Sequence, residues 1–378
     1  MKNVVIAGYC RSPFTPAQKG ELAKVRPDDL AAQVIKALVS KTGVNPDDIE
    51  DLILGCAFPE GEQGLNVARL IVFLAGLPNT VAGMTLNRFC GSSMQAIHIA
   101  AGTIQMNAGE VFICAGLESM SRIPMGGYNN MPNPALYETF PQAYIGMGDT
   151  AENLAKKYQI GRKEQEAFAL ESQRKTYDAQ QKGRFDSEIV PITYKSTVID
   201  KDGCLRPDST PEGLAVLNPA FQATGTVTAG TSSPLTDGAA AVLICSEDYA
   251  DAHKLTKMAR IKSFAVSGCA PEIMGIGPVA ATQKALARAG LTLADIGIFE
   301  LNEAFAAQSL AVLKELPIPA DKLNLDGGAI ALGHPLGATG ARITGKAASL
   351  LQRENKRYAL ATQCIGGGQG IATILEAI

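Results

Sequence analysis

The sequence lacks the features that would direct a chain to nucleic acid or into a bilayer. Its 34 basic and 37 acidic side chains give a formal net charge of −3, which excludes a generally basic nucleic-acid surface. No apolar run approaches the roughly 18 residues that a membrane span needs. The opening residues, MKNVVIAGY, have no cationic stretch ahead of a long apolar one. We therefore expect a strand there, not a signal peptide, and a cytoplasmic location.

Motifs for metals and nucleotides are also missing. The eight cysteines are scattered, with no CxxC pair and no alternation of Cys and His. This pattern argues against a zinc site or a disulfide framework and favours reduced thiols, most of them small core side chains. The GGGQG segment at 366–370 is not a dinucleotide fingerprint, and there is no P-loop. We predict no metal site.

What is present is a regular alternation of short apolar runs and amphipathic stretches. In the first 117 residues it predicts strands at 3–8, 51–57, 82–90 and 110–116 and helices at 27–43, 66–76 and 91–109. The alternation returns from about residue 258. Strands and helices at this spacing predict an α/β fold with a largely parallel sheet and helices on its faces.

The two regular stretches predict an internal duplication. In each, a turn opening a small-residue helix is followed by a strand that ends in cysteine and glycine, EVFICAG and RYALATQCIGG. We place the N-terminal half at 1–117, completed by a strand at about 238–250, and the C-terminal half at 251–378. The irregular stretch 118–237 between them is expected to be an inserted loop domain that covers a substrate.

Duplication would bring Cys90 and His334 towards a shared seam. Cys90, in NRFCGSSMQA, lies where a strand meets a helix, and the exposed N–H groups and dipole there predict a thiol pKa below ~8.5. Of the three histidines, only His334 is flanked by glycines and a proline; His98 and His253 lie in ordinary helical or loop sequence. His334 is the predicted base for Cys90 and a later donor to an oxyanion. A core cysteine is the ordinary alternative for Cys90.

Two further segments carry candidate groups. Cys364 ends a strand and precedes three glycines, whose N–H groups could form an oxyanion hole; the alternative is a cysteine packed under a tight turn. Asn302 and Glu303, in LNEAF, end another strand, where an asparagine can hold a water and a solvated turn is equally compatible. Two cysteines and one histidine in such settings suggest thiol chemistry on an acyl group.

These segments resemble those of thiolases, which are acyl-CoA acyltransferases, over essentially the whole chain. The matching motifs occur in the family's order: NRFCGSSMQA, LESMS, MGDTAENLAKKY, RFDSEIVPI, GTVTAGTSS, LNEAFAAQ, GGAIALGHPLGATGARI and CIGGGQG. The resemblance implies the thiolase fold, with two duplicated βαβαβαββ halves in a five-layered α-β-α-β-α arrangement and a loop domain inserted in the first half.

The resemblance also implies roles for single residues. Cys90 would be the acylated nucleophile, activated by His334, and Asn302 would hold a water that completes one oxyanion hole. Cys364 would be the acid/base, and the N–H groups of Cys90 and Gly366 would form a second hole. Positions that contact CoA in relatives, or line the pocket, are matched by Arg206, Ser233, Met147, Phe221, Ala304 and Phe305.

The implied reaction is CoA-dependent thiolytic cleavage of a 3-ketoacyl-CoA through a Cys90 acyl-enzyme, with ping-pong kinetics. CoA is then a substrate, and no metal or bound cofactor is required. Gly146 stands where biosynthetic acetoacetyl-CoA thiolases commonly have a histidine, which leaves room in the pocket. Together with the TSS and GCAPEIMGIGPV segments, this favours the 3-ketoacyl-CoA thiolases of fatty acid β-oxidation.

Other readings stay open at this level. The same residues would serve an acetoacetyl-CoA thiolase that condenses two acetyl-CoA. A ketoacyl-carrier-protein synthase would need a second histidine in the site, and a non-catalytic, lipid-binding relative would be expected to lose the nucleophile or the acid. The resemblance further implies a homodimer or homotetramer. A β-oxidation role would allow association with a hydratase/dehydrogenase subunit.

Overall fold

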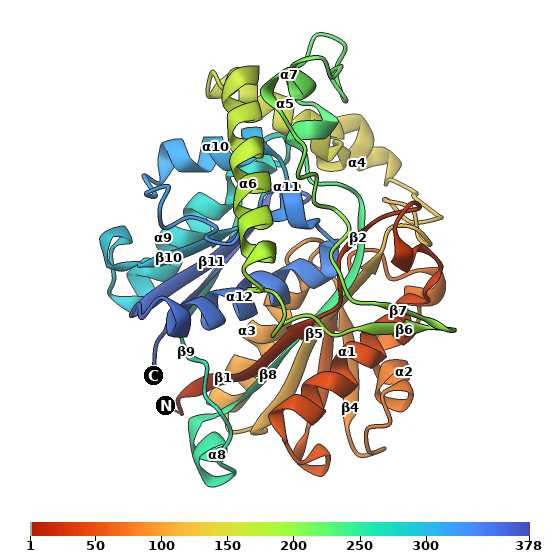
Figure 1. Ribbon diagram of the computed structural model, residues 1–378, viewed down its shortest axis with the longest axis vertical. Helices are drawn as coiled ribbons and strands as arrows, with labels where there is room; N and C mark the ends of the chain where they lie inside the picture. The colour runs from red at the N-terminus through yellow and green to blue at the C-terminus, as the bar shows by residue number, and fades with distance from the viewer. Residues whose placement is uncertain (1) are drawn as a thin grey trace.

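One mixed, ten-stranded sheet runs through the protein (Figure 1), whose computed structural model describes residues 2–378. Its strands follow one another in the order β10-β11-β12-β9-β1-β8-β5-β3-β4, and β2 pairs with β8. The bounds are β1 (Val4–Arg11), β2 (Thr15–Pro16), β3 (Asp51–Gly55), β4 (Ala82–Leu86), β5 (Val111–Ser119), β8 (Thr236–Ser246), β9 (Ala259–Gly268), β10 (Ile298–Leu301), β11 (Tyr358–Ile365) and β12 (Gln369–Glu376).

The strand directions confirm the duplication. In the first half β3 is parallel to β4 and β5, and β8 is antiparallel to β5 and β1. In the second half β10 is parallel to β11, and β12 is antiparallel to β11 and β9. An isolated parallel bridge between Phe299 and Leu323 takes the place of β4. Each half therefore follows the same βαβαβαββ pattern.

The strand directions differ from the sequence prediction. Most pairings are antiparallel, so the expectation of a largely parallel sheet was wrong. Hydrophobic periodicity does not indicate whether neighbouring strands run parallel or antiparallel. Here β8 and β12 each pair antiparallel with the strands on both sides, which makes antiparallel pairs the majority. The two halves are also joined, because Val5 and Ile6 of β1 pair with Arg260 and Ala259 of β9.

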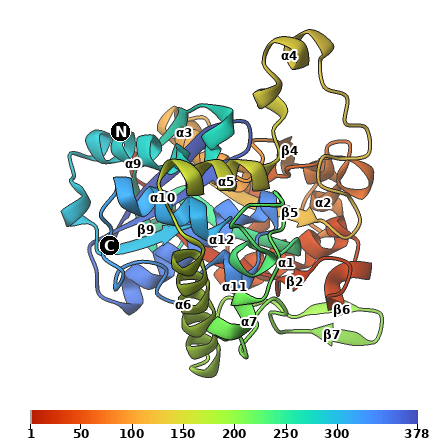
Figure 2. The same ribbon diagram turned by 90° about the horizontal axis from the view of Figure 1, so that it is seen from above.

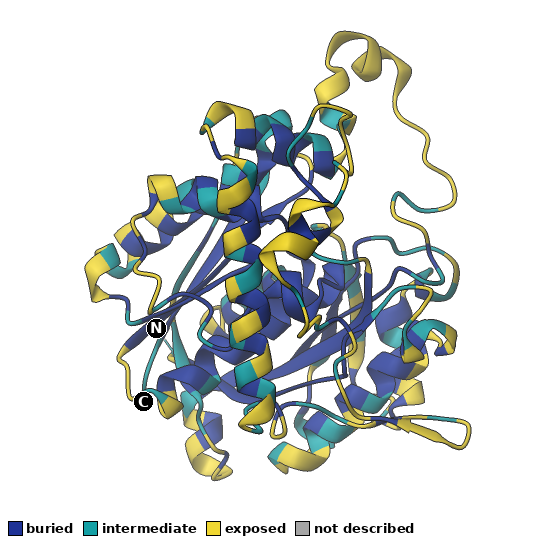
Figure 3. Ribbon diagram, turned by 45° about the horizontal axis from the view of Figure 1, so that its top comes forward, coloured by how far each residue is buried: buried dark blue, intermediate teal, exposed yellow. Residues whose placement is uncertain are grey.

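Helices cover and separate the two halves of the sheet (Figures 1 and 3). The first half carries α1 (Pro27–Thr42) and α2 (Val67–Leu74) on its outer face, and the second carries α9 (Gly277–Ala289) and α10 (Ala306–Glu315). Between the halves lie α3 (Ser92–Gln105) and α12 (Leu336–Arg353), packed on strands of both. Three large apolar cores fill the spaces between these five layers.

The central helices approach their neighbours at backbone distance. A Cβ added to Gly340 of α12 would lie 2.3 Å from the backbone nitrogen of Met94 in α3. One added to Gly337 would lie 2.5 Å from the carbonyl oxygen of Leu117 in β5. Any side chain at these two positions would push α12 away from α3 and β5, so glycine is required for the packing.

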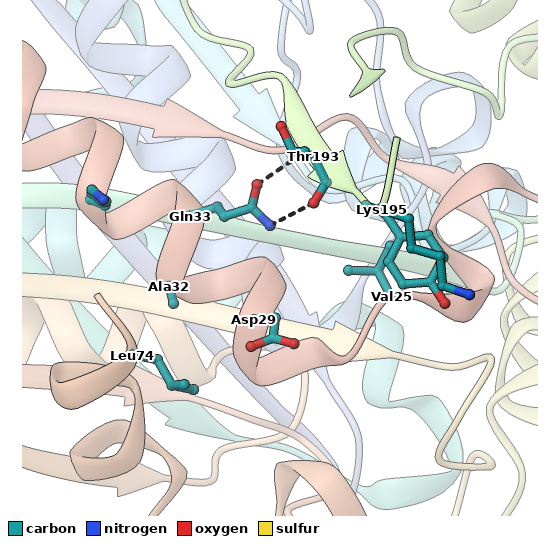
Figure 4. Close-up of a pocket in the computed structure, with 9 residues that line it drawn as sticks. Val25, Asp29, Ala32, Gln33, Leu74, Thr193 and Lys195 are labelled. Carbon is teal, nitrogen blue, oxygen red and sulfur yellow. Dashed lines mark hydrogen bonds between the residues drawn. The ribbon is translucent and has the colours of Figure 1, made fainter. Parts of the chain in front are cut away.

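The segment between β5 and β8 lies over one end of the sheet. It contains α4 (Pro134–Thr139), α5 (Met147–Lys157), α6 (Arg162–Gln181), α7 (Pro211–Ala215) and the hairpin of β6 (Ile192–Tyr194) and β7 (Thr197–Ile199). α5 and α6 pack on α10, whereas α4 projects away from the body (Figure 2). The hairpin is tied to α1, where Gln33 exchanges two hydrogen bonds of 2.8 and 3.2 Å with the backbone of Thr193 (Figure 4).

The remaining elements are short. They are the α-helices α8 (Glu247–Ala252) and α11 (Ala329–Leu332) and the 3-10 helices η1 (Glu21–Lys24), η2 (Pro46–Asp48), η3 (Gly61–Gln63), η4 (Pro141–Tyr144), η5 (Ala229–Thr231), η6 (Pro271–Ile276) and η7 (Leu293–Asp295). Among residues 2–378, no helix combines the length and the apolar content needed to cross a bilayer.

A buried chain of ion pairs ties the inserted segment to both halves. Glu188 of the insertion accepts from Arg11 of β1 at 2.8 Å and from Lys346 of α12 at 3.0 Å. Arg11 also pairs with Asp202, and Lys346 with Asp326, each at 2.7 Å. The side chains of these residues are at most 6% exposed. Removing Glu188 would take from two buried cations, Arg11 and Lys346, one of the two carboxylates that each contacts.

We expect Glu188→Gln to lower the free energy of unfolding by about 3–5 kcal/mol, the usual cost of breaking a buried ion pair by removing one charge. Urea denaturation followed by circular dichroism measures the change. The matched control is Glu171→Gln, which breaks a half-exposed pair with Arg174 and should cost less than about 1 kcal/mol. Equal effects of the two substitutions would show that the buried chain contributes nothing special to stability.

Candidate active site

A cavity of about 340 Å³ lies where Cys90, His334 and Cys364 come together. Its wall also includes Met147, Phe221, Ser233, Ala304 and Phe305, as well as Met120, Met125, Gly146, Gly148, Asp149, Ser232, Pro234, Leu235, Met274 and Leu336. Residues from both halves and from the insertion thus share one wall. The structure gathers at this cavity most of the residues that the sequence had singled out.

A tight turn presents Cys90 at the start of α3. Phe89, the residue before it, has a left-handed φ of +42°, which is unusual for a bulky side chain. The turn is closed by Ser92, whose hydroxyl accepts from the Arg88 N–H at 2.9 Å and donates to the Phe89 carbonyl at 2.6 Å. Backbone strain of this kind is often held at functional sites. The sequence carries no signal for it, because Phe89 is not a residue typical of positive φ.

Burial dominates the ionisation of Cys90. It raises the pKa of the thiol to about 12, although the backbone N–H groups of Gly366 and of Cys90 itself act in the opposite direction. The predicted low thiol pKa was therefore wrong, because desolvation of the thiolate outweighs the favourable field of the helix start. At neutral pH Cys90 is a neutral thiol, and a base must remove its proton before it can act as a nucleophile.

His334 lines the same cavity as Cys90. Its backbone N–H donates to Thr236 Oγ1 at 3.0 Å, its Nδ1 lies 2.6 Å from Thr339 Oγ1, and its Nε2 lies 3.4 Å from Asn302 Nδ2. Burial, helped by the positive charge of Arg342, lowers the pKa of the imidazole to about 3. His334 is therefore neutral at physiological pH and able to accept a proton. Oδ1 of Asn302 is buried with no hydrogen-bond partner, as expected of a group that binds a water or a ligand.

A buried carboxylate fixes the start of α12 just after His334. Glu118, at the end of β5, accepts from the backbone N–H of Ala57 at 2.8 Å and of Gly337 at 2.9 Å. Burial raises the pKa of Glu118, and these N–H donors act against that rise. Glu118 was not predicted as a site residue, although an acidic residue in the otherwise small and apolar stretch ICAGLESM was a usable signal.

Cys364 provides a second neutral thiol. It is 1% exposed, and burial followed by the nearby Cys90 raises its pKa well above the ordinary value. The turn after it needs glycine, since Gly367 and Gly368 have φ of +77° and +83°. The neighbouring Gln363 donates to the Cys90 carbonyl at 2.6 Å, which connects the two cysteine-bearing segments directly.

Part of the cavity wall is formed by the insertion and by residues that follow β10. Ser233 donates to the carbonyl of Ala304 through its backbone N–H at 3.0 Å and its hydroxyl at 3.1 Å. Phe221 and Phe305 meet edge to face at 5.8 Å. Arg206 lies outside the cavity wall, with Nη2 3.4 Å from the carbonyl oxygen of Ile330. Within residues 2–378, no three His, Cys, Asp or Glu side chains are grouped as a metal ion would require.

Comparison with known families gives full-length matches. The model described as "Thiolase, N-terminal domain" matches residues 4–248, and "Thiolase, C-terminal domain" matches residues 255–377. A relative from Bacillus subtilis named 3-ketoacyl-CoA thiolase is 48% identical over 389 residues, covering 100% of both chains. One of the same name from Acinetobacter baylyi is 48% identical over 385 residues, covering 100% of this chain and 98% of its own.

Solved structures agree with these matches. Human mitochondrial 3-ketoacyl-CoA thiolase in complex with CoA superimposes with a TM-score of 0.92 at 40% identity, covering 100% of this chain and 98% of that one. The acetyl-CoA acetyltransferase of Bacillus anthracis has the same TM-score at 41% identity, covering 100% and 99%. The duplicated fold expected from the sequence is thereby confirmed.

We expect His334→Asn to slow alkylation of Cys90 by iodoacetamide at about pH 8 by 10²-fold or more, since a general base typically contributes 10²–10⁴-fold. Mass spectrometry of the Cys90 peptide measures the rate. His253→Asn, at an exposed histidine that follows α8, is the control and should leave it unchanged. Alkylation of His334→Asn at the original rate would mean that Cys90 ionises without this base.

Proposed function

The chain belongs to the thiolase family, and on this premise we propose that it cleaves 3-ketoacyl-CoA with CoA to acetyl-CoA and a shortened acyl-CoA. The observation that carries the proposal is the meeting of Cys90, His334 and Cys364 at one cavity. The names of relatives nearly half identical over the full length support the same reaction. The chain is an acyltransferase, as the sequence analysis predicted.

In the first half-reaction Cys90 takes up the acyl group. His334 removes the thiol proton, and the thiolate attacks C3 of the substrate. The bond between C2 and C3 then breaks, its electron pair stays on C2, and Cys364 protonates that carbon to give acetyl-CoA. The buried, neutral state of Cys364 suits it to deliver this proton.

In the second half-reaction CoA removes the acyl group. The Cys364 thiolate takes the proton of the CoA thiol, and the sulfur of CoA attacks the Cys90 thioester. Shortened acyl-CoA leaves, and the Cys90 thiolate recovers its proton from His334. Both steps develop negative charge on a carbonyl oxygen. We assign one oxyanion site to His334 with a water on Asn302, and the other to the N–H groups of Cys90 and Gly366.

For the CoA portion we propose contacts with Ser233, Arg206 and the inserted segment 118–237, with Met147, Phe221, Ala304 and Phe305 lining the pocket. A relative has been solved with CoA bound, and CoA is here a substrate, with no other cofactor in the proposed cycle. A cytoplasmic location is in keeping with eight unpaired cysteines.

A role in fatty acid β-oxidation is supported by Gly146, which lines the cavity and leaves space there. Such a role would need an upstream hydratase and dehydrogenase to supply the 3-ketoacyl-CoA, and their subunit could associate with this enzyme. The alternative is an acetoacetyl-CoA thiolase acting in condensation. It is favoured by the similarity to the acetyl-CoA acetyltransferase of Bacillus anthracis.

We propose that the enzyme is a homo-oligomer built across the open edge of the sheet. β4 is the last strand in the sheet order, and its Met84 is 36% exposed. On and before the adjacent α2, Leu65, Phe73 and Leu74 are 89%, 50% and 50% exposed. An unpaired edge beside apolar side chains suits a twofold, self-complementary contact.

We expect Cys364→Ala to be acylated on Cys90 by a simple acyl-CoA but to lose thiolysis of 3-ketoacyl-CoA by at least about 10²-fold, because the carbanion lacks its acid. Intact-protein mass spectrometry and loss of the Mg-enolate absorbance measure the two properties. Cys269→Ala, at a partly exposed cysteine outside the cavity wall, is the control. Full thiolysis by Cys364→Ala would refute its assignment as the acid.

We expect Gly146→His to reduce thiolysis of long 3-ketoacyl-CoA roughly tenfold relative to acetoacetyl-CoA, since overpacking costs about 1–3 kcal/mol. Gly146 has φ −68°, so the backbone accepts a side chain. Steady-state kcat/KM across chain lengths, in both enzymes, is the measurement. Gly161→His, at the exposed start of α6, is the control. If the unsubstituted enzyme acts only on acetoacetyl-CoA, the result would instead favour an acetoacetyl-CoA thiolase that acts in condensation.

A further inference from the structure

A buried chain of hydrogen bonds continues from His334 to a residue with no part in the steps above. Thr339, in the first turns of α12, is 0% exposed. Its Oγ1 lies 2.6 Å from His334 Nδ1 and 3.2 Å from the carbonyl oxygen of Pro335. On the other side of the imidazole, Nε2 lies 3.4 Å from Asn302 Nδ2. The ring is thus held at both nitrogens.

The chemistry of the groups gives this chain a direction. An amide nitrogen can only donate and a carbonyl oxygen can only accept. If Asn302 donates to Nε2, a neutral imidazole carries its proton on Nδ1 and donates it to Thr339, whose own proton then goes to Pro335. The opposite tautomer would set two donors against each other at Nε2. In that tautomer the Thr339 hydroxyl would also have to donate its proton to Nδ1. The carbonyl oxygen of Pro335 would then lose the hydrogen bond that it accepts from Thr339.

We infer that Thr339 is a positioning residue that holds His334 in the Nδ1–H tautomer. Nε2 then carries no proton and can accept the Cys90 proton in place of the long hydrogen bond from Asn302. The inference rests on the proposed function only in making His334 the base. A carboxylate on Nδ1 would fix the same tautomer but would favour the charged imidazolium. A hydroxyl orients the ring without adding charge, which keeps the resting base neutral.

The charged groups around the imidazole do not provide this orientation. Arg342, one turn further along α12, is paired with Glu300 of β10 at 3.1 Å and disfavours protonation of His334. The thiols of Cys90 and Cys364 share the cavity and are neutral at rest. Thr339 is therefore the group in contact with Nδ1 that can select the tautomer.

Nitrogen-15 NMR of the full-length enzyme labelled at histidine tests the assignment, since the chain has only three histidines. His334→Asn identifies the His334 signals. Near neutral pH we expect one tautomer, with the proton on Nδ1. In Thr339→Val we expect loss of that single tautomer and Cys90 acylation slowed about 10–100-fold, the usual effect of removing such a supporting contact. We expect KM for the 3-ketoacyl-CoA to stay within about twofold.

The conservative variant and the pH profile separate positioning from general damage. Thr339→Ser keeps the hydroxyl and should restore the tautomer and most of the rate, whereas Thr339→Val should move the pH profile of Cys90 alkylation upward. A proton on Nε2 in the original enzyme would overturn the inference, as would an unchanged tautomer and pH profile in Thr339→Val. If Thr339→Val does not fold, the original spectrum decides. Failure of Cys90 to acylate would refute the proposed function and leave the tautomer result standing.

Discussion

The backbone contact of α12 with α3 and β5 is the constraint on which the site depends. Gly337 and Gly340 leave no space for a side chain at these contacts. Because Cys90 and His334 each lie two residues before the first residue of α3 and of α12, the helix packing restricts the distance between thiol and imidazole. Glu118 reinforces it by accepting the Gly337 N–H. Cys90 and His334 are thus held by closely packed helices and not by a flexible loop.

The surroundings of the two groups also decide their resting protonation. Burial acts against the charged form of each group, so it raises the pKa of Cys90 to about 12 and lowers that of His334 to about 3. Thiol and imidazole therefore rest as a neutral pair. In the mechanism that we propose, the N–H groups of Cys90 and Gly366 near the sulfur and Asn302 near Nε2 would stabilise the charges that appear when a substrate reacts. Such an arrangement favours a transition state over a resting enzyme.

The order of the elements and the main site residues could be predicted from the sequence. Alternating apolar and amphipathic stretches indicate strands and helices, and Cys90, His334 and Cys364 stand beside glycines that indicate turns. The strands and helices of the first half, such as α1 ending at Gly43 with φ +68°, were predicted closely. Quantities set by distant packing were not. The thiol pKa of Cys90 came out wrong because desolvation cannot be seen in neighbouring residues. The ion pair of Arg11 with Glu188 joins residues 177 positions apart, beyond any local pattern.

The sheet register shows how one duplicated scaffold yields an asymmetric site. Glu118 pairs with Gly238 in the first half, and Cys364 pairs with Gly370 in the second. Each lies two residues past the last parallel pairing of its strand, so the counterpart of Cys364 is Glu118. The matching sequence ends, EVFICAG and RYALATQCIGG, had instead indicated Cys114 as the counterpart. After Cys364 a tight glycine turn leads directly into β12, whereas after Glu118 the chain opens into the long insertion. In the second half this position thus carries the thiol of Cys364. In the first half it carries Glu118, which anchors the start of α12 and leads into the inserted segment.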